Sequence, residues 1–309
     1  MAILLHSTFS PPGPWIEAFA ELLPDDDVVT LDLVDDPADI EFAVVWDLPV
    51  EEFARFHNLR AILLTGSGGS HLKPVEALPA GVPVVRLVDR AVADDMAAYS
   101  LHWVIHFQRG IDRYLAQQTT ADWVVHDFIP TDEHTVGVLG YGNVGARVAD
   151  RLLANGYPVR AWSRSPKPGA PVETFTGPGE LGTFLSGCRA VINVLPLTPE
   201  TRNVLDADRL ATMPSGAALI NIGRGGTVDD AALIAALDSG HLNGVALDVF
   251  REEPLPDWSP YWNHPRVAVT PHISGAAQPR SSTSYIAANI ERIRRGETPF
   301  PLFVAERGY

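Results

Sequence analysis

Short apolar runs separated by longer, helix-like polar segments are the feature that most constrains the fold of this 309-residue chain. Their β-branched composition and weak internal alternation predict strands that are buried on both faces. Strands that alternate with helices predict parallel, doubly wound sheets with right-handed crossovers. The runs are "AILLH", "DVVTLDL", "EFAVVW", "RAILLTG" and "VPVVRL", followed after residue 134 by "TVGVLG", "YPVRAW", "AVINVLP", "AALINIG", "GVALDVF" and "RVAVTPH".

The two series of runs predict two domains, as does the length of the chain. Residues 281–297 form a helix-like stretch with no strand after it, so we expect this stretch to return to the first domain. The predicted fold class is α/β, with two doubly wound parallel-sheet domains and a cleft between them. The predicted bounds are residues 1–97 with 281–309 for a flavodoxin-like substrate (catalytic) domain, and residues 98–280 for a Rossmann cofactor domain.

Two further segments carry structural expectations. Residues 92–117 place apolar side chains at helical spacing over much more than the length of an average helix. This segment is expected to link the domains or to support a homodimer. Residues 165–180 are rich in Pro and Gly and are expected to be a connecting loop.

A glycine turn follows one apolar run and opens an amphipathic stretch. In a dinucleotide-binding fold the first glycine permits the tight turn, and the second lets the backbone approach a pyrophosphate. The third glycine allows close helix–strand packing, and the helix that begins there offers N–H donors. The alternative is an ordinary glycine-rich turn. The residues predicted to bind the cofactor here are Gly140, Tyr141, Gly142, Asn143, Val144 and Gly145.

The next run ends at Ser163, where NAD-binding folds usually carry an acid for the ribose 2′-hydroxyl. This chain has Ser163, Arg164, Ser165 and Lys167 there instead. Hydroxyls and cations bind a 2′-phosphate, which a carboxylate would repel. The segment therefore predicts that NADP(H) is preferred, with NAD(H) as a second cofactor. The alternative is a solvated loop with incidental cations.

Three later apolar runs each lead into a reactive side chain, namely Arg224, Glu253 and His272. Ligands of open α/β sheets bind beyond the carboxyl ends of the strands, so we expect these side chains to converge on one crevice. An Arg offers a planar fork to a carboxylate, and a His exchanges a proton while a neighbouring Glu fixes its tautomer. Beside a nicotinamide, this set predicts hydride transfer to a 2-keto acid. His272 would be the general acid and Arg224 would hold the substrate carboxylate.

With these motifs in this order, the chain resembles the D-isomer-specific 2-hydroxyacid dehydrogenases along nearly its whole length. The motifs are the glycine turn, "NVLPLTPETRNVL", "NIGRG", "LDVFREEP" and "TPHISG". The resemblance implies that Arg224 binds the substrate, that His272 is the acid/base with Glu253 as its partner, and that Asp248 contacts the cofactor carboxamide. It also implies cofactor contacts from Leu195, Pro196, Thr201, Ile222, Gly223 and His272.

Within that family the chain is most similar to a subgroup that uses NADPH, through "VVWDLPVE", residues 86–114, "WSRSPK" and "ERGY". This similarity implies a small polar 2-keto acid, glyoxylate or hydroxypyruvate, as the substrate. The family's substrate loop usually reads Gly-Ala-Gly-Val-Asp, whereas residues 66–70 read "GSGGS". Gly69 and Ser70 therefore depart from the family pattern, and we expect an altered pocket. The predicted substrate-binding residues are Trp46, Ser67, Gly68, Gly69 and Arg224.

Composition excludes several other classes of protein. A net charge of −15 disfavours binding to nucleic acid, and no apolar run approaches the ~18–20 residues that cross a bilayer. The single cysteine, Cys188, fits a reducing compartment, so a cytoplasmic location is expected. His102 and His106 are four residues apart on a predicted helix, but no third ligand accompanies them, so no metal site is predicted.

Two other functions remain as alternatives. One is a non-catalytic dinucleotide sensor or corepressor-like protein, since fold alone does not fix function. The other is a formate- or phosphite-type dehydrogenase. The complete set of Arg224, Glu253 and His272 favours an enzyme, and Glu253, where a formate-type site would be expected to carry Gln, favours keto-acid chemistry.

Overall fold

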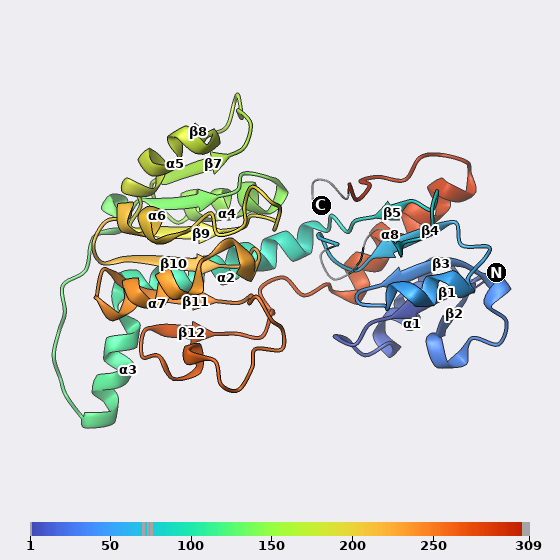
Figure 1. The fold of residues 1–309 in the computed structure, drawn as a ribbon, viewed down its shortest axis with the longest axis horizontal. Helices are drawn as coiled ribbons and strands as arrows, with labels where there is room; N and C mark the ends of the chain where they lie inside the picture. The colour runs from blue at the N-terminus through green and yellow to red at the C-terminus, as the bar shows by residue number, and fades with distance from the viewer. Residues whose placement is uncertain (1, 70–71, 73, 75–76, 305–309) are drawn as a thin grey trace. The chain divides into compact units, whose positions relative to one another are not determined.

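The computed structural model describes residues 2–69, 72, 74 and 77–304, and the chain divides into two compact units. Unit 1 is Met1–Val92 with Ala276–Tyr309, and unit 2 is Ala93–Gly275. Each unit holds one sheet with helices packed against it, and every pair of neighbouring strands is parallel (Figure 1). The predicted α/β fold class with two parallel sheets is therefore confirmed.

The sheet of unit 1 has the strand order β2-β1-β3-β4-β5. The inner strands are almost wholly apolar and buried, which is why the sequence shows runs rather than alternation. Helices α1 (Gly13–Leu22) and α8 (Pro279–Arg294) pack against each other, so the helix-like stretch near the end of the chain belongs to unit 1. The strands are β1 (Ala2–His6), β2 (Asp27–Thr30), β3 (Ile40–Val45), β4 (Ala61–Leu64) and β5 (Val84–Val85), and the short 3-10 helices are Leu31–Leu33, Pro37–Asp39 and Val50–Arg55.

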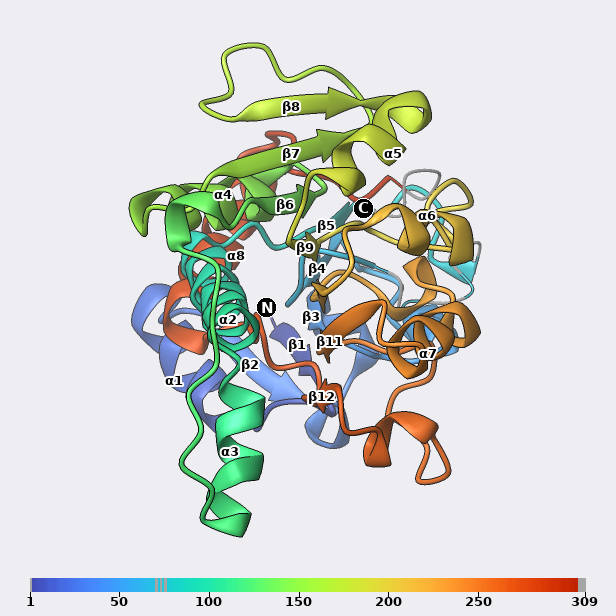
Figure 2. The ribbon, with the colours of Figure 1, turned by 90° about the vertical axis from the view of Figure 1, so that its left-hand side faces the viewer.

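The sheet of unit 2 has the order β12-β11-β10-β9-β6-β7-β8, with β8 at one edge and β12 at the other (Figure 2). Its strands are β6 (Val136–Leu139), β7 (Val159–Ser163), β8 (Glu173–Thr176), β9 (Ala190–Asn193), β10 (Ala217–Asn221), β11 (Leu242–Leu247) and β12 (Val267–Val269). Its helices are α2 (Arg90–Arg109), which begins in unit 1, α3 (Ile111–Thr120), α4 (Asn143–Ala154), α5 (Gly177–Ser186), α6 (Ala207–Thr212) and α7 (Asp230–Asp238). The 3-10 helices are Thr131–Glu133, Gly225–Thr227 and Pro260–Asn263.

Two local expectations from the sequence are wrong. Residues 165–180 are not only a loop, because β8 pairs with β7 within them and buries Phe175. The expected single helix over residues 92–117 is broken at Gly110, whose φ of 59° is left-handed. Glycine adopts this conformation without a steric penalty, so α2 ends and α3 begins in a new direction.

The strand order fixes where ligands can bind. Strands β6 and β9 are neighbours in the middle of the unit 2 sheet, and the chain winds outward from them in both directions. In doubly wound sheets, ligands bind at such a switch point, beyond the carboxyl ends of the strands. In unit 1 the corresponding switch lies between β1 and β3.

His134 is a buried titratable group that precedes β6, at the amino ends of the unit 2 strands. Neither of its ring nitrogens has a hydrogen-bond partner among the described residues. Burial, and then the positive charge of Arg189, lower the pKa of His134 to about 4. The folded protein therefore holds this imidazole neutral over a pH range in which an unfolded chain would protonate it.

We expect the free energy of unfolding to fall as the pH drops from about 6.5 to about 4, because the unfolded state binds the proton that the folded state refuses. The loss is at most about 3 kcal/mol, from a pKa difference worth about 1.4 kcal/mol per unit. Urea denaturation of the wild type and of His134→Phe at several pH values measures it. The variant should lose much of this pH dependence, whereas His241→Gln, a control imidazole bonded to the Leu210 carbonyl, should keep it. Equal slopes in the wild type and His134→Phe would contradict the assignment.

Candidate active site

The glycine turn after β6 has the tight geometry that its sequence predicts. Gly140 has a φ of 111°, and a Cβ at Gly145 would lie 1.9 Å from the Gly140 carbonyl oxygen. A Cβ at Gly142 would meet nothing within 4 Å, so the backbone there borders open space. Two of the glycines are thus required by packing, and the third leaves room for a group that approaches the main chain.

Helix α4 starts from this turn with Gly142 at its N-cap, and no side chain of the described residues caps it. The first-turn N–H groups of Asn143, Val144 and Gly145 therefore point out of the helix as donors. Tyr141 is half-buried, and burial followed by the charge of Asp150 raises its pKa, so its phenol stays protonated. Donors arranged in this way can accept an anionic group such as a pyrophosphate.

The predicted 2′-phosphate segment has one buried and several accessible members. Ser163 is buried, and its hydroxyl donates to the Ser165 carbonyl at 2.7 Å, so this hydrogen bond stabilises the loop. Arg164 and Ser165 are exposed, and Lys167 is half-buried. The cations and the Ser165 hydroxyl are thus better placed than Ser163 to meet a phosphate.

Arg164 lies close to the loop that follows β9. The Thr198 hydroxyl, the backbone N–H of Glu200 and the charge of Arg164 lower the pKa of the exposed Glu200. The Thr198 hydroxyl donates to Glu200 at 2.8 Å. The segment after β7 therefore lies within electrostatic reach of the segment after β9.

The side chain of Thr201 stabilises the loop that follows β9. Its hydroxyl donates to the Pro196 carbonyl at 2.6 Å and accepts the N–H of Thr198 at 2.8 Å. Leu195 is buried, and a Cβ at Gly223 would lie 2.6 Å from the Leu195 carbonyl oxygen. Of the predicted cofactor residues, Leu195, Pro196, Thr201, Ile222 and Gly223 thus form two loops in close contact.

A buried amide pair beneath these loops was not predicted from the sequence. Asn193 ends β9 and Asn221 ends β10, and the Asn193 side chain donates to Asn221 Oδ1 at 2.9 Å and to the Thr227 hydroxyl at 2.7 Å. The Thr227 hydroxyl in turn donates to the Arg224 carbonyl at 2.6 Å. This network fixes the backbone of the loop that carries Arg224. In the sequence, an Asn at the end of each of two fully apolar runs indicates this network.

His272 and Glu253 are joined by a hydrogen bond just beyond β12 and β11. His272 Nδ1 lies 2.7 Å from Glu253 Oε2, and Glu253 Oε1 accepts the Phe250 N–H at 2.8 Å. Burial raises the pKa of Glu253, but the hydrogen bond and charge of His272, the Phe250 N–H and the charge of Arg224 together bring it below its usual range. A carboxylate only accepts, so Nδ1 is the donor and Nε2 is the proton-exchanging atom.

Arg224 lies within electrostatic reach of Glu253. Burial lowers the pKa of the Arg224 guanidinium and the charge of Glu253 opposes this, while Arg224 donates to the Gly223 carbonyl at 2.7 Å. A Cβ at Gly225 would lie 2.1 Å from the carbonyl carbon of Phe250, so the two loops touch backbone to backbone. The structure therefore brings Arg224, Glu253 and His272 together at one edge of the sheet.

Asp248 is fully buried, and both of its carboxylate oxygens accept hydrogen bonds from the His272 loop. Oδ1 accepts from the Thr270 hydroxyl at 2.6 Å and from the Ile273 N–H at 2.9 Å, and Oδ2 accepts from the Ser274 N–H at 2.9 Å. The family resemblance implies a contact with the cofactor carboxamide. The structure shows that Asp248 also organises the loop that carries the histidine.

The predicted substrate residues of unit 1 lie on the loops after β3 and β4. Trp46 is half-buried and packs over Gly66, where a Cβ would lie 2.4 Å from the indole ring. Ser67 is exposed and Gly68 is buried. A Cβ at Gly69 would lie 2.7 Å from the ring of Phe303, so this aromatic side chain takes the space that a bulkier residue 69 would occupy. Ser70 lies outside the described residues.

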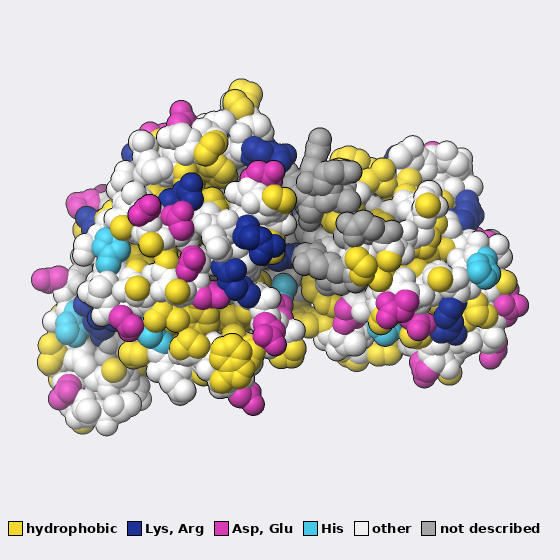
Figure 3. Space-filling model, in the orientation of Figure 1, with side chains coloured by type: hydrophobic (Ala, Val, Ile, Leu, Met, Phe, Trp, Pro, Cys, Tyr) yellow, Lys and Arg dark blue, Asp and Glu magenta, His cyan; other side chains and the backbone are white. Residues whose placement is uncertain are grey.

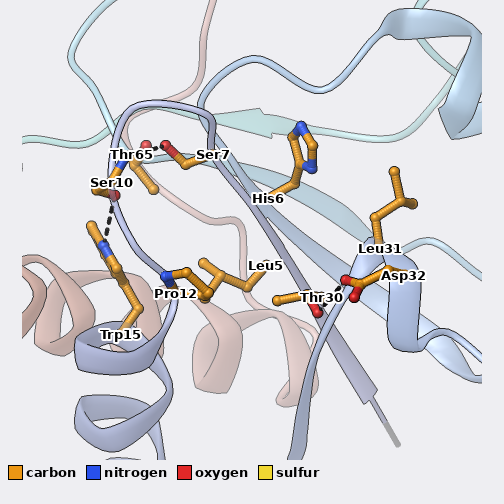
Figure 4. Close-up of a pocket in the computed structure, with 10 residues that line it drawn as sticks. All are labelled: Leu5, His6, Ser7, Ser10, Pro12, Trp15, Thr30, Leu31, Asp32 and Thr65. Atoms are coloured by element: carbon orange, nitrogen blue, oxygen red, sulfur yellow. Dashed lines mark hydrogen bonds between the residues drawn. The ribbon is translucent and has the colours of Figure 1, made fainter.

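A cavity of about 440 Å³ lies beside these loops within unit 1, at the carboxyl ends of β1, β2 and β4 (Figure 4). Several of its polar side chains form hydrogen bonds within the cavity wall. Ser7 Oγ accepts the Ser10 N–H at 3.2 Å, and the Trp15 indole donates to Ser10 Oγ at 3.1 Å. The Thr30 hydroxyl donates to Asp32 at 2.6 Å and lowers the pKa of that carboxyl.

Charged side chains are distributed over both units. On the face that Figure 3 shows, Asp and Glu side chains are scattered rather than gathered into one patch. Among the described residues, no group of three or more His, Cys, Asp or Glu side chains could hold a metal ion, and the rings of His102 and His106 are 6.1 Å apart. Within the described ranges, no helix is both long and apolar enough to cross a membrane.

Comparison with known proteins identifies the family. Residues 101–274 match the model of the D-isomer specific 2-hydroxyacid dehydrogenase NAD-binding domain. The chain is 40% identical to glyoxylate/hydroxypyruvate reductase A of Klebsiella pneumoniae, over 99% of both chains. A D-isomer specific 2-hydroxyacid dehydrogenase from Xanthobacter autotrophicus, solved with NADPH and MES, is 40% identical with a TM-score of 0.93, over 100% of this chain and 99% of that one.

An NADPH-dependent glyoxylate/hydroxypyruvate reductase from Sinorhizobium meliloti, solved with NADP and sulfate, is 30% identical with a TM-score of 0.93, again over 100% of this chain and 99% of that one. These similarities extend over both units. The chain belongs to the D-isomer-specific 2-hydroxyacid dehydrogenase family.

Proposed function

We propose that this protein reduces a small 2-keto acid, glyoxylate or hydroxypyruvate, to the 2-hydroxy acid with NADPH. The observation that carries the proposal is the His272–Glu253 pair at 2.7 Å, with Arg224 within electrostatic reach at the same sheet edge. The Klebsiella and Sinorhizobium relatives carry this activity in their names, and they match nearly the whole chain.

The residues of this site divide the chemistry between them. NADPH, when bound, would supply a hydride, a proton with two electrons, for transfer to the carbonyl carbon. His272, as imidazolium, gives the proton from Nε2 to the carbonyl oxygen as the C=O π bond breaks, and Glu253 stabilises the charge of that imidazolium. Arg224 binds the substrate carboxylate with its planar fork and orients the carbonyl. The sum of these steps is keto acid plus hydride plus proton, giving the hydroxy acid.

The residues of unit 2 fit the cofactor. The open side of Gly142 and the N–H groups at the start of α4 would hold the pyrophosphate. Arg164, Ser165 and Lys167 would hold the 2′-phosphate, where an NAD-specific site would carry an acid. The backbone conformation of Gly140 and the packing at Gly145 require glycine, and Gly142 leaves its backbone open to a ligand, which supports the assignment.

Transfer of deuterium tests the reaction directly. Wild-type protein, [4-²H]NADPH of the transferring configuration and glyoxylate or hydroxypyruvate should give a product with deuterium at C2, detected by mass spectrometry. The glycerate formed should be the D-isomer. NADPH oxidation without label in either product would contradict the proposed reaction.

The Arg164→Asp variant should bind NADPH about 10- to 100-fold more weakly while NADH affinity changes little, since a charge-assisted bond to the 2′-phosphate is lost. Fluorescence titration of both cofactors measures this. The matched control is Arg151→Asp, the same charge reversal at an exposed position in the last turn of α4. Equal losses for NADPH and NADH would show that Arg164 does not read the phosphate.

We also propose that the protein is a cytoplasmic homodimer whose contact includes α3 and the segment after it. Both belong to unit 2 and carry a concentration of exposed apolar side chains, with Trp123 97% and Val125 82% exposed. Such patches on a folded unit mark interaction surfaces. The exposed apolar residues of this region are Ile111, Leu115, Trp123, Val124, Val125 and Phe128.

The Trp123→Asp variant should weaken the dimer, because a charge replaces a large apolar side chain in the contact. Size-exclusion chromatography with light scattering at micromolar concentration should show a dimer for the wild type and a shift toward monomer for the variant. Trp258→Asp is the control, since Trp258 is 79% exposed but lies elsewhere in unit 2. A monomeric wild type would refute the dimer.

A further inference from the structure

A chain of short hydrogen bonds connects α2 to the loop that carries His272. The hydroxyls of Tyr99 and Thr270 are 2.6 Å apart, and the Thr270 hydroxyl donates to Asp248 Oδ1 at 2.6 Å. A hydroxyl has one proton, so Thr270 accepts from Tyr99 while it donates to the carboxylate. The direction of the chain is therefore fixed, from Tyr99 through Thr270 to Asp248.

The far end of this chain is the backbone around the histidine. Asp248 accepts the N–H groups of Ile273 and Ser274, both at 2.9 Å, and its own carbonyl accepts the His272 N–H at 2.9 Å. Three consecutive amides of the loop are thus held by one buried residue. An acceptor that is fully buried relies on all of its donors, because an unmade bond there leaves the charge uncompensated.

His272 needs this support because its backbone is strained. Its φ is 55°, in the left-handed region that a residue with a Cβ rarely adopts. Such a conformation persists only where the surroundings determine it. A relaxed loop would turn the imidazole away from Glu253, which it meets at 2.7 Å, and the proton donor would lose its orientation.

Tyr99 has the properties that a fixed donor requires. It is half-buried on α2, and burial, with a contribution from the charge of Asp248, raises its pKa to about 12. The phenol therefore remains protonated at neutral pH and well above it. The neighbouring Ser100 is buried as well, but its hydroxyl donates to the Met96 carbonyl within α2 and has no part in the chain.

We propose that Tyr99 and Thr270 are positioning residues that hold His272 in its working conformation through Asp248. This inference rests on the proposed role of His272 as the general acid, and it adds two residues that touch neither substrate nor cofactor in the account above. Their loss should therefore reduce the rate of the proton-coupled step more than the binding of the keto acid.

The test combines kinetics with a spectroscopic signal that exists without turnover. Thr270→Val keeps the shape of the side chain and deletes its hydroxyl, Thr270→Ser keeps the hydroxyl, and Tyr99→Phe deletes only the phenol. Ser100→Ala is the matched control, a buried hydroxyl lost from the same helix. Proton NMR follows the low-field signal of the His272 Nδ1–H, assigned by its loss in His272→Gln.

We expect Thr270→Val to lower kcat about 10- to 100-fold and Tyr99→Phe about 3- to 10-fold, the range for buried bonds to charged and to neutral acceptors. KM for the keto acid should change less, and the Nδ1–H signal should broaden or vanish in Thr270→Val. Thr270→Ser and Ser100→Ala should keep both properties of the wild type.

The inference is overturned if Thr270→Val keeps its kcat and its Nδ1–H signal, or if Ser100→Ala loses as much activity as Tyr99→Phe. If the wild type shows the Nδ1–H signal and Thr270→Val loses it, the positioning role stands even where no keto acid is turned over. In that case the proposed function fails alone, so the two failures are distinguishable.

Discussion

Replacing His272 with Gln should lower kcat for keto-acid reduction by about 100- to 10,000-fold, the usual contribution of a general acid. The imidazole is the group that protonates the forming alkoxide, and Glu253 Oε2, 2.7 Å from Nδ1, holds its orientation. NADPH affinity should stay within about threefold of the wild type, because the proton transfer occurs only in the reaction step and Gln is also polar. Pre-steady-state rates and NADPH titration measure the two effects separately.

The chain offers a close control for this variant. His264 lies at the other end of β12, with its Nε2 3.3 Å from Asp238, so His264→Gln removes a second histidine that is paired with a carboxylate. It should leave kcat within about twofold of the wild type, because this histidine precedes β12 and lies at the end of the strand opposite to His272. Full activity of His272→Gln across the pH range would remove the acid/base assignment.

Replacing Arg224 with Ala should raise KM for the keto acid about 10- to 100-fold or more, because charge-assisted bonds to the substrate carboxylate are lost. Arg224→Lys separates charge from geometry. Lysine keeps the positive charge but lacks the planar fork, so it should recover only part of the loss. NADPH binding should be nearly unchanged in both variants.

Comparison with a substrate that lacks the carboxylate makes this test more specific. Glyoxal, with an aldehyde in place of the acid, should be reduced about equally poorly by the wild type and by Arg224→Ala. If Arg224→Ala lowered the rates of glyoxal and glyoxylate reduction by the same factor, Arg224 would support the fold of the loop rather than bind the carboxylate.

The strands and the order of the site motifs could be predicted because both depend on local sequence. Each of the predicted runs contains a strand, since a strand buried on both faces must be apolar throughout. Arg224, Glu253 and His272 follow neighbouring strands β10, β11 and β12, and parallel strands end at the same sheet edge. Topology alone therefore brings them together.

What was missed depends on contacts between distant parts of the chain. The edge strand β8 buries only Phe175 among its four residues, so it gives no apolar run. Gly69 departs from the family pattern, and the structure shows the ring of Phe303 in the space that this glycine leaves open. No local pattern relates residue 69 to residue 303, so this pairing could not be predicted from either segment.

The role of Asp248 shows a similar limit. A resemblance assigns it to the cofactor, but its three hydrogen bonds to the His272 loop appear only when the loop is folded. The same holds for Asn193 and Asn221, whose amide pair joins two strand ends. Each is a polar residue at the end of a buried strand. In a sequence, a polar residue at such a position indicates a side chain that holds the following loop.

Initial rates of NADPH and NADH oxidation with glyoxylate, hydroxypyruvate and pyruvate would test the central claim most directly. The site predicts rapid NADPH oxidation with glyoxylate or hydroxypyruvate, slower oxidation with pyruvate, and about tenfold or greater preference for NADPH over NADH, the value of one charge-assisted contact to the 2′-phosphate. Tight binding of NADPH with no turnover of any of the three keto acids would contradict the claim and would favour a dinucleotide sensor.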